Sequence, residues 1–577
     1  MQLEEIRRVA MKYALLNALQ YKGKASLKAV IGKVIAEQPE LRKHIEIVRK
    51  VVSEVVDVVN SMSIDEQRRK LEDEYGPEVL GASKRKTKDR EGLPPLPNVE
   101  AIMRKYGMVV TRFAPAPTGA LHIGQLVRAA MLSYLYAKRY NGKMILRIED
   151  TDPRVIKRIY YDWILEDLKS VGIKWDELII VSDRFERHYE IAEKLIRSGC
   201  AYVCICPSEK FRIYKEKRIE CPDRMLPPEE HLKRWKGMLE GEYGEGEAVV
   251  RLKVSMFHPN PVLRDPPLLR IIESVPHPLK GYKYRVYPLY NFACAIEDHD
   301  SCVTHIIRAK EHEHNAAVQA EIHKALGWEM PIAIQYGMVY LEGYKLHKRH
   351  IREGLKKGEL TGWDDVRLPT VRALIRRGIQ PEAIKRLALE LSLTPHDIKL
   401  SIETLYAFNR KVIDPIANRY YFVEDPIKMI IHDAPVPLIV KLRLHPQYPE
   451  RGFREYRFLK SPLEVYVSKS DLEKKRKGDE IRLIELFNVK ISEISNEVVE
   501  GVYTGMEIRQ DIPKIQWVSE PFLYAEIMKP DGGISRGFIE LHAQNIREGE
   551  IVQLERYAFV RLEKNEGEVL KFLYLHR

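Results

Sequence analysis

Two short stretches of the chain carry side chains suited to binding the phosphates of a nucleotide. His122 and Gly124 stand at the predicted start of a helix, where free N–H groups and the positive end of the helix dipole attract an anion. Far downstream, Lys345 and Lys348 lie three residues apart, so their ammonium groups could flank a triphosphate. We therefore expect these side chains to bind the phosphates of a nucleotide.

The residues around His122 predict a strand, a helix and a second strand. An apolar run from 108 to 113 ends in a loop rich in Pro and Gly, and a helical pattern then continues to Asn141-Gly142. A second apolar run covers 143–148. Parallel strands of such a unit point their carboxyl ends at one crevice, which would hold Arg112 and Glu149. A later predicted strand, 302–307, would bring Arg308 to the same edge.

Other nucleotide-binding patterns are missing from the sequence. No GxGxxG follows a strand and no GxxxxGK[ST] occurs, which argues against a dinucleotide site or a P-loop ATPase. Directly after the second strand, Asp152 and Pro153 fit the N-cap and first position of a helix, so we expect Asp152 to be structural.

The cysteines indicate a metal site more readily than a disulfide framework. Six cysteines in 577 residues are few, and four of them cluster at positions 200, 204, 206 and 221. The spacing of Cys204, Cys206 and Cys221 is compatible with zinc. Three buried structural cysteines are the alternative.

The composition is that of a multidomain globular protein. A chain of 577 residues has room for roughly four domains. No apolar run is long enough for a membrane span, and the charged N-terminus lacks a secretory signal, so we expect a cytoplasmic protein without a membrane partner. The net charge of +12 favours a polyanionic partner, although a Lys- and Glu-rich thermostable surface would also produce it.

Three motifs together point to one family. RFAPAPTGALHIGQ (112–125) followed by RIEDTDPR (147–154) resembles the first signature of class I glutamyl- and glutaminyl-tRNA synthetases. KLHKR (345–349) has the place and type of the class I KMSKS loop, and 360–381 resembles the GWDDPRLPTLRALRRRGI run of this family. The chain departs from these patterns with Gln125 in the fourth place of the HIGH tetrad, His347 where serine is common and Val366 for proline.

The resemblance implies a multidomain fold built on an α/β Rossmann-type class I synthetase catalytic domain. C-terminal all-β barrels of the archaeal and eukaryotic type would read the anticodon. In order, we expect a helical N-terminal domain (1–82), a linker (83–105), the catalytic domain (106–200 and 286–350), an α/β insertion for the tRNA acceptor stem (201–285), a helical tRNA-binding subdomain (351–415) and the β-barrel region (416–577).

The implied reaction is the ATP-dependent activation of L-glutamate to glutamyl-adenylate, with Mg²⁺, and its transfer to the 3′ end of tRNA(Glu). Arg112, Glu149, Tyr290 and Arg308 would bind glutamate, with Glu149 on the ammonium. Arg308 replaces a neutral Cys of glutamine-specific relatives and would face the γ-carboxylate; a surface salt bridge is its alternative role. The ATP-binding residues implied by the resemblance are Pro115, His122, Gly124 and Lys348. Catalysis would depend on alignment and positive charge, with His122, Lys345 and Lys348 as the catalytic residues.

Some relatives place a fourth zinc ligand two residues after the third cysteine, a position that Asp223 occupies here. Two rival functions stay open at this point. Arg308 opposes a glutaminyl-tRNA synthetase, whereas Gln125 and His347 would suit a non-catalytic tRNA-binding paralogue. How loosely the barrels read the third anticodon base decides whether tRNA(Gln) is a second partner.

Overall fold

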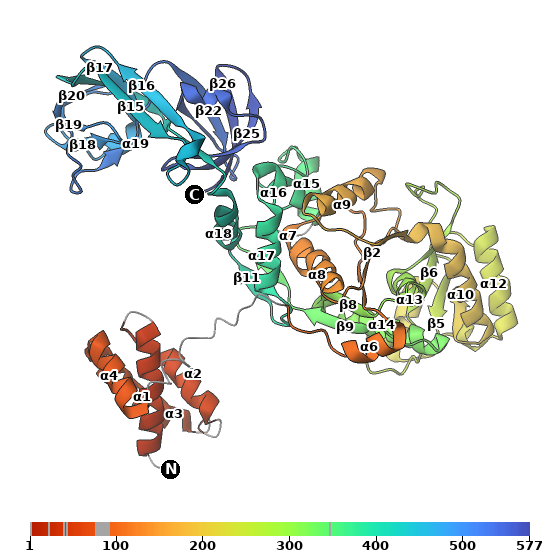
Figure 1. Cartoon of the computed structure of the whole chain (residues 1–577). Helices are drawn as coiled ribbons and strands as arrows, with labels where there is room; N and C mark the ends of the chain where they lie inside the picture. Colours follow the sequence, from red (N-terminus) through yellow and green to blue (C-terminus); the bar gives the residue numbers. More distant parts are fainter. Residues whose placement is uncertain (1–2, 21–22, 39–40, 42–43, 76–92, 345–347) are drawn as a thin grey trace. The chain divides into compact units, whose positions relative to one another are not determined.

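The computed structural model describes residues 3–20, 23–38, 41, 44–75, 93–344 and 348–577 of the chain. It divides into two compact units, residues 1–92 and 93–577, which Figure 1 draws from red to blue along the chain. Lys345 and His347 lie outside the described residues, as does the first part of the predicted linker.

The first unit is helical, as predicted. It consists of α1 (Leu3–Gln20), α2 (Leu27–Glu37), α3 (Ile45–Ser61) and α4 (Ile64–Tyr75). Val48, Val52, Val55 and Val59 recur at helical spacing on α3, and all four are buried in the core of this unit.

The second half of the predicted linker is folded, which corrects that prediction for residues 93–105. Leu93 and Leu96 are buried in the core of the second unit, and Val99–Tyr106 form α6. The Leu96 N–H donates to the Tyr140 hydroxyl at 3.0 Å. The apolar residues of this Pro-rich stretch therefore pack against the catalytic region instead of forming a solvated tether.

The centre of the second unit is a five-stranded parallel sheet in the order β3-β2-β1-β8-β9. The chain leaves β1 toward β2 on one side and returns as β8 on the other, so the switch point where a ligand crevice opens lies at the end of β1. The strands are β1 (Val110–Phe113), β2 (Lys143–Ile148), β3 (Glu177–Ile180), β8 (His305–Ala309) and β9 (Ile332–Tyr336).

The predicted helix after β1 exists but is not α-helical throughout. It begins as α7 (Ile123–Gln125), continues as a π-helical turn (Leu126–Ala130) and ends as α8 (Met131–Arg139). Arg128 in the π turn is buried and donates to the backbone oxygens of Ser392 at 2.8 Å and Thr394 at 2.9 Å. π turns of this kind are frequent at functional sites.

Asp152 does not cap the next helix. α9 begins six residues later (Arg158–Ser170), with Lys157 at its N-cap. Asp152 instead accepts hydrogen bonds from Arg154 at 2.9 Å and Arg270 at 2.8 Å. The proline at 153 fits a turn as well as a helix start, so the local pattern did not decide between them.

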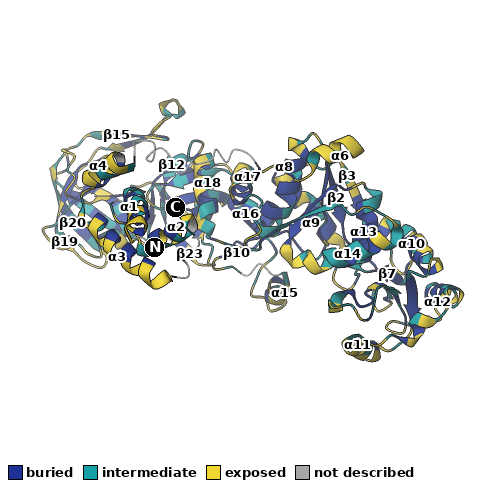
Figure 2. Cartoon of the chain, turned by 90° about the horizontal axis from the view of Figure 1, so that it is seen from below, coloured by how far each residue is buried: buried dark blue, intermediate teal, exposed yellow. Residues whose placement is uncertain are grey.

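An antiparallel sheet and several helices separate β3 from β8 in the sequence. The sheet contains β4 (Ala201–Cys204), β5 (Val249–Leu252), β6 (Pro267–Ile271) and β7 (Val286–Pro288). The helices of this part are α10 (Phe185–Arg197), α11 (Ser208–Lys217), α12 (Pro228–Glu240) and α13 (Tyr290–Asp300), and α14 (Glu313–Leu326) follows β8. Figure 2 shows α10 and α12 with buried residues on one side and exposed residues on the other.

A helical segment follows β9 and the short strand β10 (Val339–Leu341), and the strand β11 (Ile398–Leu400), which pairs with β10, lies between its last two helices. Its helices are α15 (Lys348–Lys356), α16 (Val371–Arg377), α17 (Pro381–Leu391) and α18 (Ile402–Ile413). None of the described helices is long and apolar enough to cross a membrane.

The C-terminal region is almost entirely β-structure, as predicted. A seven-stranded sheet runs β12-β24-β25-β26-β22-β23-β13, a six-stranded sheet runs β17-β14-β20-β19-β18-β21, and β15 pairs with β16. Strand β14 alternates buried and half-buried residues, the pattern of a strand with one face on a core. The bounds are β12 Asn418–Tyr420, β13 Phe422–Glu424, β14 Pro426–His432, β15 Leu438–Arg443, β16 Phe453–Phe458, β17 Leu463–Ser468, α19 Lys469–Leu472, β18 Glu480–Leu483, β19 Asn488–Ile494, β20 Val498–Gly505, β21 Lys514–Ile515, β22 Phe522–Met528, β23 Ile534–Glu540, β24 Ile551–Leu554, β25 Ala558–Asn565 and β26 Val569–His576.

Candidate active site

A cavity of about 360 Å³ opens at the carboxyl ends of the parallel strands. All four residues predicted to bind an amino acid line it: Arg112 at the end of β1, Glu149 after β2, Tyr290 at the start of α13 and Arg308 on β8. Pro115 and Gln125 line the same cavity. The sheet therefore brings together side chains that lie up to about two hundred residues apart in the sequence. The strand pattern predicted this for Arg112, Glu149 and Arg308, and the family resemblance implied it for Tyr290.

A second cavity, of about 540 Å³, lies beside the edge strand β3. Its charged lining residues are already paired: Lys143 with Glu177, and Arg184 with Asp300. The cavity at the strand ends differs because it holds buried polar atoms without partners, and it is the better candidate for a ligand site.

Two lining residues of the smaller cavity, Arg112 and Glu149, belong to a buried network centred on Asp298. Its Oδ1 accepts from Arg112 Nε at 3.1 Å and from Arg147 Nη1 at 2.6 Å. Burial by itself would raise the pKa of Asp298, but the two guanidinium groups reverse this and hold the pKa below its usual range. Asp298 is therefore ionised and fixes the orientation of both arginines.

Only one of the two carboxylate oxygens of Glu149 accepts a hydrogen bond from a described residue. Its Oε1 accepts from Arg147 Nε at 2.9 Å, whereas Oε2 is buried and has no hydrogen-bond partner among the described residues. Burial raises the pKa of Glu149, and Arg147 and Arg112 oppose that rise. A cation placed in the cavity would satisfy Oε2 and favour the carboxylate form.

Arg308 is the positive counterpart of Glu149. Its Nη1 donates to Gln319 Oε1 at 2.8 Å, while Nε and Nη2 are buried without partners. The side chain is only 4% exposed, and no carboxylate in the described part of the chain pairs with it, so the alternative role in a surface salt bridge is wrong. Two free N–H groups on a buried guanidinium form a site for an anionic oxygen.

Tyr290 and His312 form one wall of the cavity. Their ring centroids are 5.8 Å apart. Burial raises the pKa of Tyr290, so its hydroxyl is protonated at neutral pH and can donate a hydrogen bond. Burial also lowers the pKa of His312, which favours the neutral ring.

The residues predicted to bind phosphates lie next to the cavity, but not all of them line it. His122 caps α7: its Nδ1 accepts from the Gln125 N–H at 3.2 Å, which places the proton of the neutral ring on Nε2. Gln125 itself reaches the cavity, and its Oε1 is buried without a partner. His122 and Gly124 are absent from the cavity lining, so their predicted contact with ATP stays a prediction.

Lys348 also lies outside the lining, and it contacts the loop that precedes His122. Its Nζ donates to the Gly119 carbonyl at 2.9 Å. Burial of the ammonium end lowers its pKa to about 8, although Asp167 opposes the shift. The structure therefore joins the two predicted phosphate-binding segments through a lysine-to-backbone contact.

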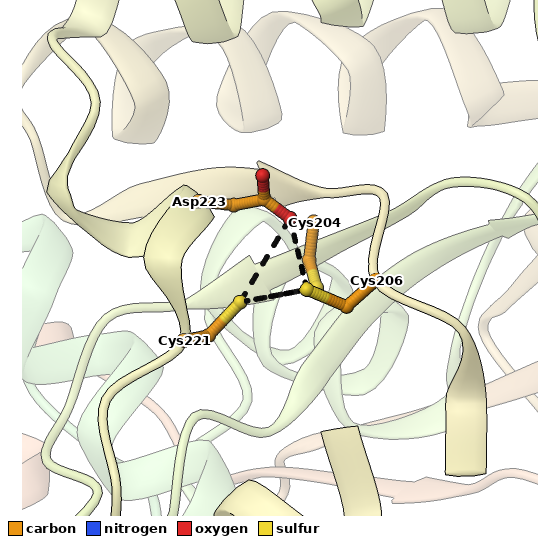
Figure 3. Close-up of side chains that lie close together, drawn as sticks. All are labelled: Cys204, Cys206, Cys221 and Asp223. Carbon is orange, nitrogen blue, oxygen red and sulfur yellow. Dashed lines mark hydrogen bonds between the residues drawn. The ribbon is translucent and has the colours of Figure 1, made fainter. Parts of the chain in front are cut away.

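The predicted zinc ligands form a second candidate site. The ligand atoms of Cys204, Cys206, Cys221 and Asp223 all lie within 4.8 Å of one another. Figure 3 shows the four side chains pointing toward one another, with Cys221 Sγ 3.3 Å from Cys206 Sγ and 3.7 Å from Cys204 Sγ. Arg234 holds the other oxygen of Asp223 at 2.9 Å. A hydrogen bond with Cys221 lowers the pKa of Cys204 to about 6, so its sulfur is largely thiolate at neutral pH.

Sequence reasoning did not find Arg147, Asp298 or Cys294, whose sulfur accepts from Arg147 Nη2 at 3.2 Å in the same buried network. A signal was available for two of them, because Tyr290, Cys294 and Asp298 recur every four residues and share one face of α13. Arg147 lies inside the quoted RIEDTDPR motif, yet its position on a strand gives no indication of its partners.

Comparison with known proteins gives matches along most of the chain. A family model described as "tRNA synthetases class I (E and Q), catalytic domain" matches residues 108–415, and one described as "tRNA synthetases class I (E and Q), anti-codon binding domain" matches residues 417–508. A glutamate-tRNA ligase from Pyrococcus abyssi is 48% identical over 99% of this chain and 100% of its own. One from Methanopyrus kandleri is 40% identical over 100% of both. A crystal structure of a glutamate tRNA ligase from Elizabethkingia meningosepticum, 22% identical, covers 54% of this chain and 70% of its own with a TM-score of 0.40, too low to bear on the fold.

Proposed function

The chain belongs to the class I tRNA synthetases for glutamate and glutamine, and we propose that it is a glutamate-tRNA ligase. It activates L-glutamate with ATP and transfers the glutamyl group to the 3′ end of tRNA(Glu). A region matched by the family's anticodon-binding model follows the catalytic region. We assign the protein to the cytoplasm, where ATP and tRNA are available.

The observation that carries the choice of glutamate is the pair of unpartnered groups in the cavity. Arg308 offers two free N–H donors and Glu149 offers one free oxygen. L-glutamate carries a γ-carboxylate for the first and an α-ammonium for the second, and Tyr290 can donate a further hydrogen bond. Glutamine would present an amide to Arg308, which loses the charge-assisted hydrogen bonds and leaves a buried guanidinium without an anion.

The ion pairs around the cavity support the same choice. Asp298 pairs with Arg112 and Arg147, and Glu149 pairs with Arg147, whereas no carboxylate among the described residues pairs with Arg308. The side chain of glutamate would supply the missing anion, and that of glutamine would not.

Both chemical steps need alignment and positive charge. In the first, an α-carboxylate oxygen attacks the α-phosphorus of ATP and pyrophosphate leaves. In the second, a ribose hydroxyl of the terminal adenosine attacks the acyl carbon and AMP leaves. We assign the contacts with the phosphates to the His122 ring and to the ammonium groups of Lys345 and Lys348. Pro115 and Gly124 would lie beside the nucleotide, and Mg²⁺ would bind with it.

We assign a structural zinc ion to the cysteine cluster. Sulfur ligands at about 2.3 Å from a tetrahedral zinc lie about 3.8 Å from one another. The Sγ atom of Cys221 is 3.7 Å and 3.3 Å from the other two sulfurs, and the fourth place is taken by an oxygen of Asp223. The cluster adjoins α11, whose exposed lysines and arginines suit contacts with tRNA phosphates in the proposed acceptor-stem insertion, 201–285.

The remaining regions take the roles expected of the family. We assign catalysis to 106–200 and 286–350, tRNA contacts to 351–415 and anticodon reading to 416–577. The N-terminal helices within 1–82 have no assigned role.

The test is to measure ATP–pyrophosphate exchange and aminoacylation by the purified full-length protein, with glutamate or glutamine and with tRNA(Glu) or tRNA(Gln). We expect exchange and charging with glutamate and tRNA(Glu). Charging with glutamine instead, or no exchange with either amino acid, would overturn the proposal. The tRNA(Gln) arm shows whether that tRNA is a second substrate.

A further inference from the structure

A buried carboxylate on α9 contacts the segment that leads into the His122 motif. Asp167 is 2% exposed, and its Oδ2 accepts the backbone N–H of Leu121 at 3.1 Å. The carbonyl of Leu121 in turn accepts the N–H of Val371 at 2.8 Å. Leu121 directly precedes His122, so both backbone groups of the residue before the motif are fixed from outside its own helix.

The same carboxylate faces two cations from other elements. Arg372 Nη1 on α16 lies 3.6 Å from Asp167 Oδ1. The charge of Lys348 acts on Asp167 as well, and that lysine donates to the carbonyl of Gly119, two residues before Leu121. Asp167 therefore stands where the His122 segment, α15 and α16 meet.

The loop at this junction has little room to adjust. Gly119 has a φ of +139°, and a Cβ there would lie 2.2 Å from the ring of Trp363. Trp363 packs with Tyr160 and Trp163, which lie on the same helix as Asp167. Because the loop is rigid, a change in the position of Asp167 also changes the position of His122.

We propose that Asp167 is a positioning residue for the ATP-dependent step, holding the His122 segment, to which the Lys348 ammonium also binds through the Gly119 carbonyl. Asp167 does not line the cavity, so it acts through these two groups and not on substrate. The inference rests on the proposed function. A purely structural carboxylate would stabilise the fold equally but would show no energetic coupling to Lys348 in catalysis.

The charge of Asp167 is sensitive to pH near neutrality. Burial raises its pKa to about 7, while the Leu121 N–H, Arg372 and Lys348 oppose the rise and Glu166 adds to it. The carboxylate is thus present above about pH 7 and is lost below. Coupling that depends on its charge must weaken as the pH falls through that value.

The experiment is a double-mutant cycle of Asp167→Asn with Lys348→Met, read by kcat and KM for ATP in glutamate-dependent pyrophosphate exchange. The amide of Asp167→Asn can still accept the Leu121 N–H but has no charge. We expect a roughly tenfold loss of kcat/KM for ATP, the scale of one charged hydrogen bond, with KM for glutamate unchanged. In Asp167→Asn, the decline of kcat/KM for ATP below about pH 7 should disappear. The loss of kcat/KM for ATP caused by Asp167→Asn should be much smaller in a protein that already carries Lys348→Met.

Glu166→Gln is the matched control, because Glu166 is an exposed neighbour that binds the same Arg372 at 2.9 Å. This variant should keep the wild-type values. Additive effects in the cycle, or an equal loss in Glu166→Gln, would overturn the role of Asp167. Wild-type protein without glutamate-dependent exchange would instead overturn the proposed function, so the two failures are distinguishable.

Discussion

The Arg147 guanidinium donates to the Asp298 carboxylate at 2.6 Å, although 151 residues separate them in the sequence. Arg147 is 0% and Asp298 is 2% exposed. The same carboxylate also holds Arg112, and Arg147 in turn holds Glu149. A single acid on α13 therefore orients the charged groups at the ends of β1 and β2.

Replacing Asp298 by Ala should lower the free energy of unfolding by about 3–5 kcal/mol, because it leaves two buried guanidinium groups without their partner. Urea unfolding at pH 7 measures this. The folded-state pKa of Asp298 is depressed, so its stabilisation is complete above the unfolded value of about 3.9 and declines as the pH falls below it. The difference between wild type and variant should shrink correspondingly below about pH 4. Asp162→Asn, which removes an exposed pair with Arg158, is the control and should cost little.

Replacing Arg308 by Cys should impair glutamate use selectively. Two nitrogen donors disappear from the cavity, and each charged hydrogen bond is worth about 1.5–3 kcal/mol. Loss of one bond should lower kcat/KM for glutamate roughly tenfold to a hundredfold, and loss of both should lower it further. The KM for ATP and the melting temperature should change little, because the variant removes a buried charge that has no ionic partner. Arg308→Lys should recover part of the loss. Unchanged glutamate kinetics in Arg308→Cys would rule out the assignment.

The activity should decline at alkaline pH because of Lys348. Burial lowers its pKa to about 8, so the ammonium is present below that pH and is lost above it. We expect kcat/KM for ATP to decline as the pH rises through about 8, and Lys348→Arg to retain activity to higher pH. Lys356→Arg on the same helix is an exposed control. An identical alkaline limb in wild type and Lys348→Arg would show that another group titrates.

The purified protein should contain one zinc ion per chain, measurable by elemental analysis. Cys221→Ser and Asp223→Asn should lose it, and a chelator should lower the melting temperature of the wild type by roughly 5 °C or more, since the ion joins two separate turns of the insertion. Cys302→Ser, at an exposed cysteine outside the cluster, should keep the metal. Zinc-free protein with an unchanged melting temperature would contradict the site.

The sequence by itself determined the strand–helix–strand unit around His122 and the convergence of Arg112, Glu149 and Arg308, whereas Tyr290 was expected from the resemblance to the synthetase family. Apolar periodicity marks parallel strands, and parallel strands place their carboxyl ends at one edge, so residues at those ends must be neighbours. The cysteine cluster followed from spacing in a similar way, because its three sulfurs and Asp223 lie within twenty residues of one another.

Tertiary structure alone decided which groups are already paired and which are free. Arg147 and Asp298 are partners because β2 and α13 pack together, and Lys348 lies on the Gly119 carbonyl because α15 packs beside the loop. The same holds for the π turn around Arg128 and for Asp152, which binds Arg270 instead of capping α9. Local patterns encode periodicity and chain direction, whereas the partner of a buried charge depends on which distant segment supplies the nearest opposite charge once the chain is folded.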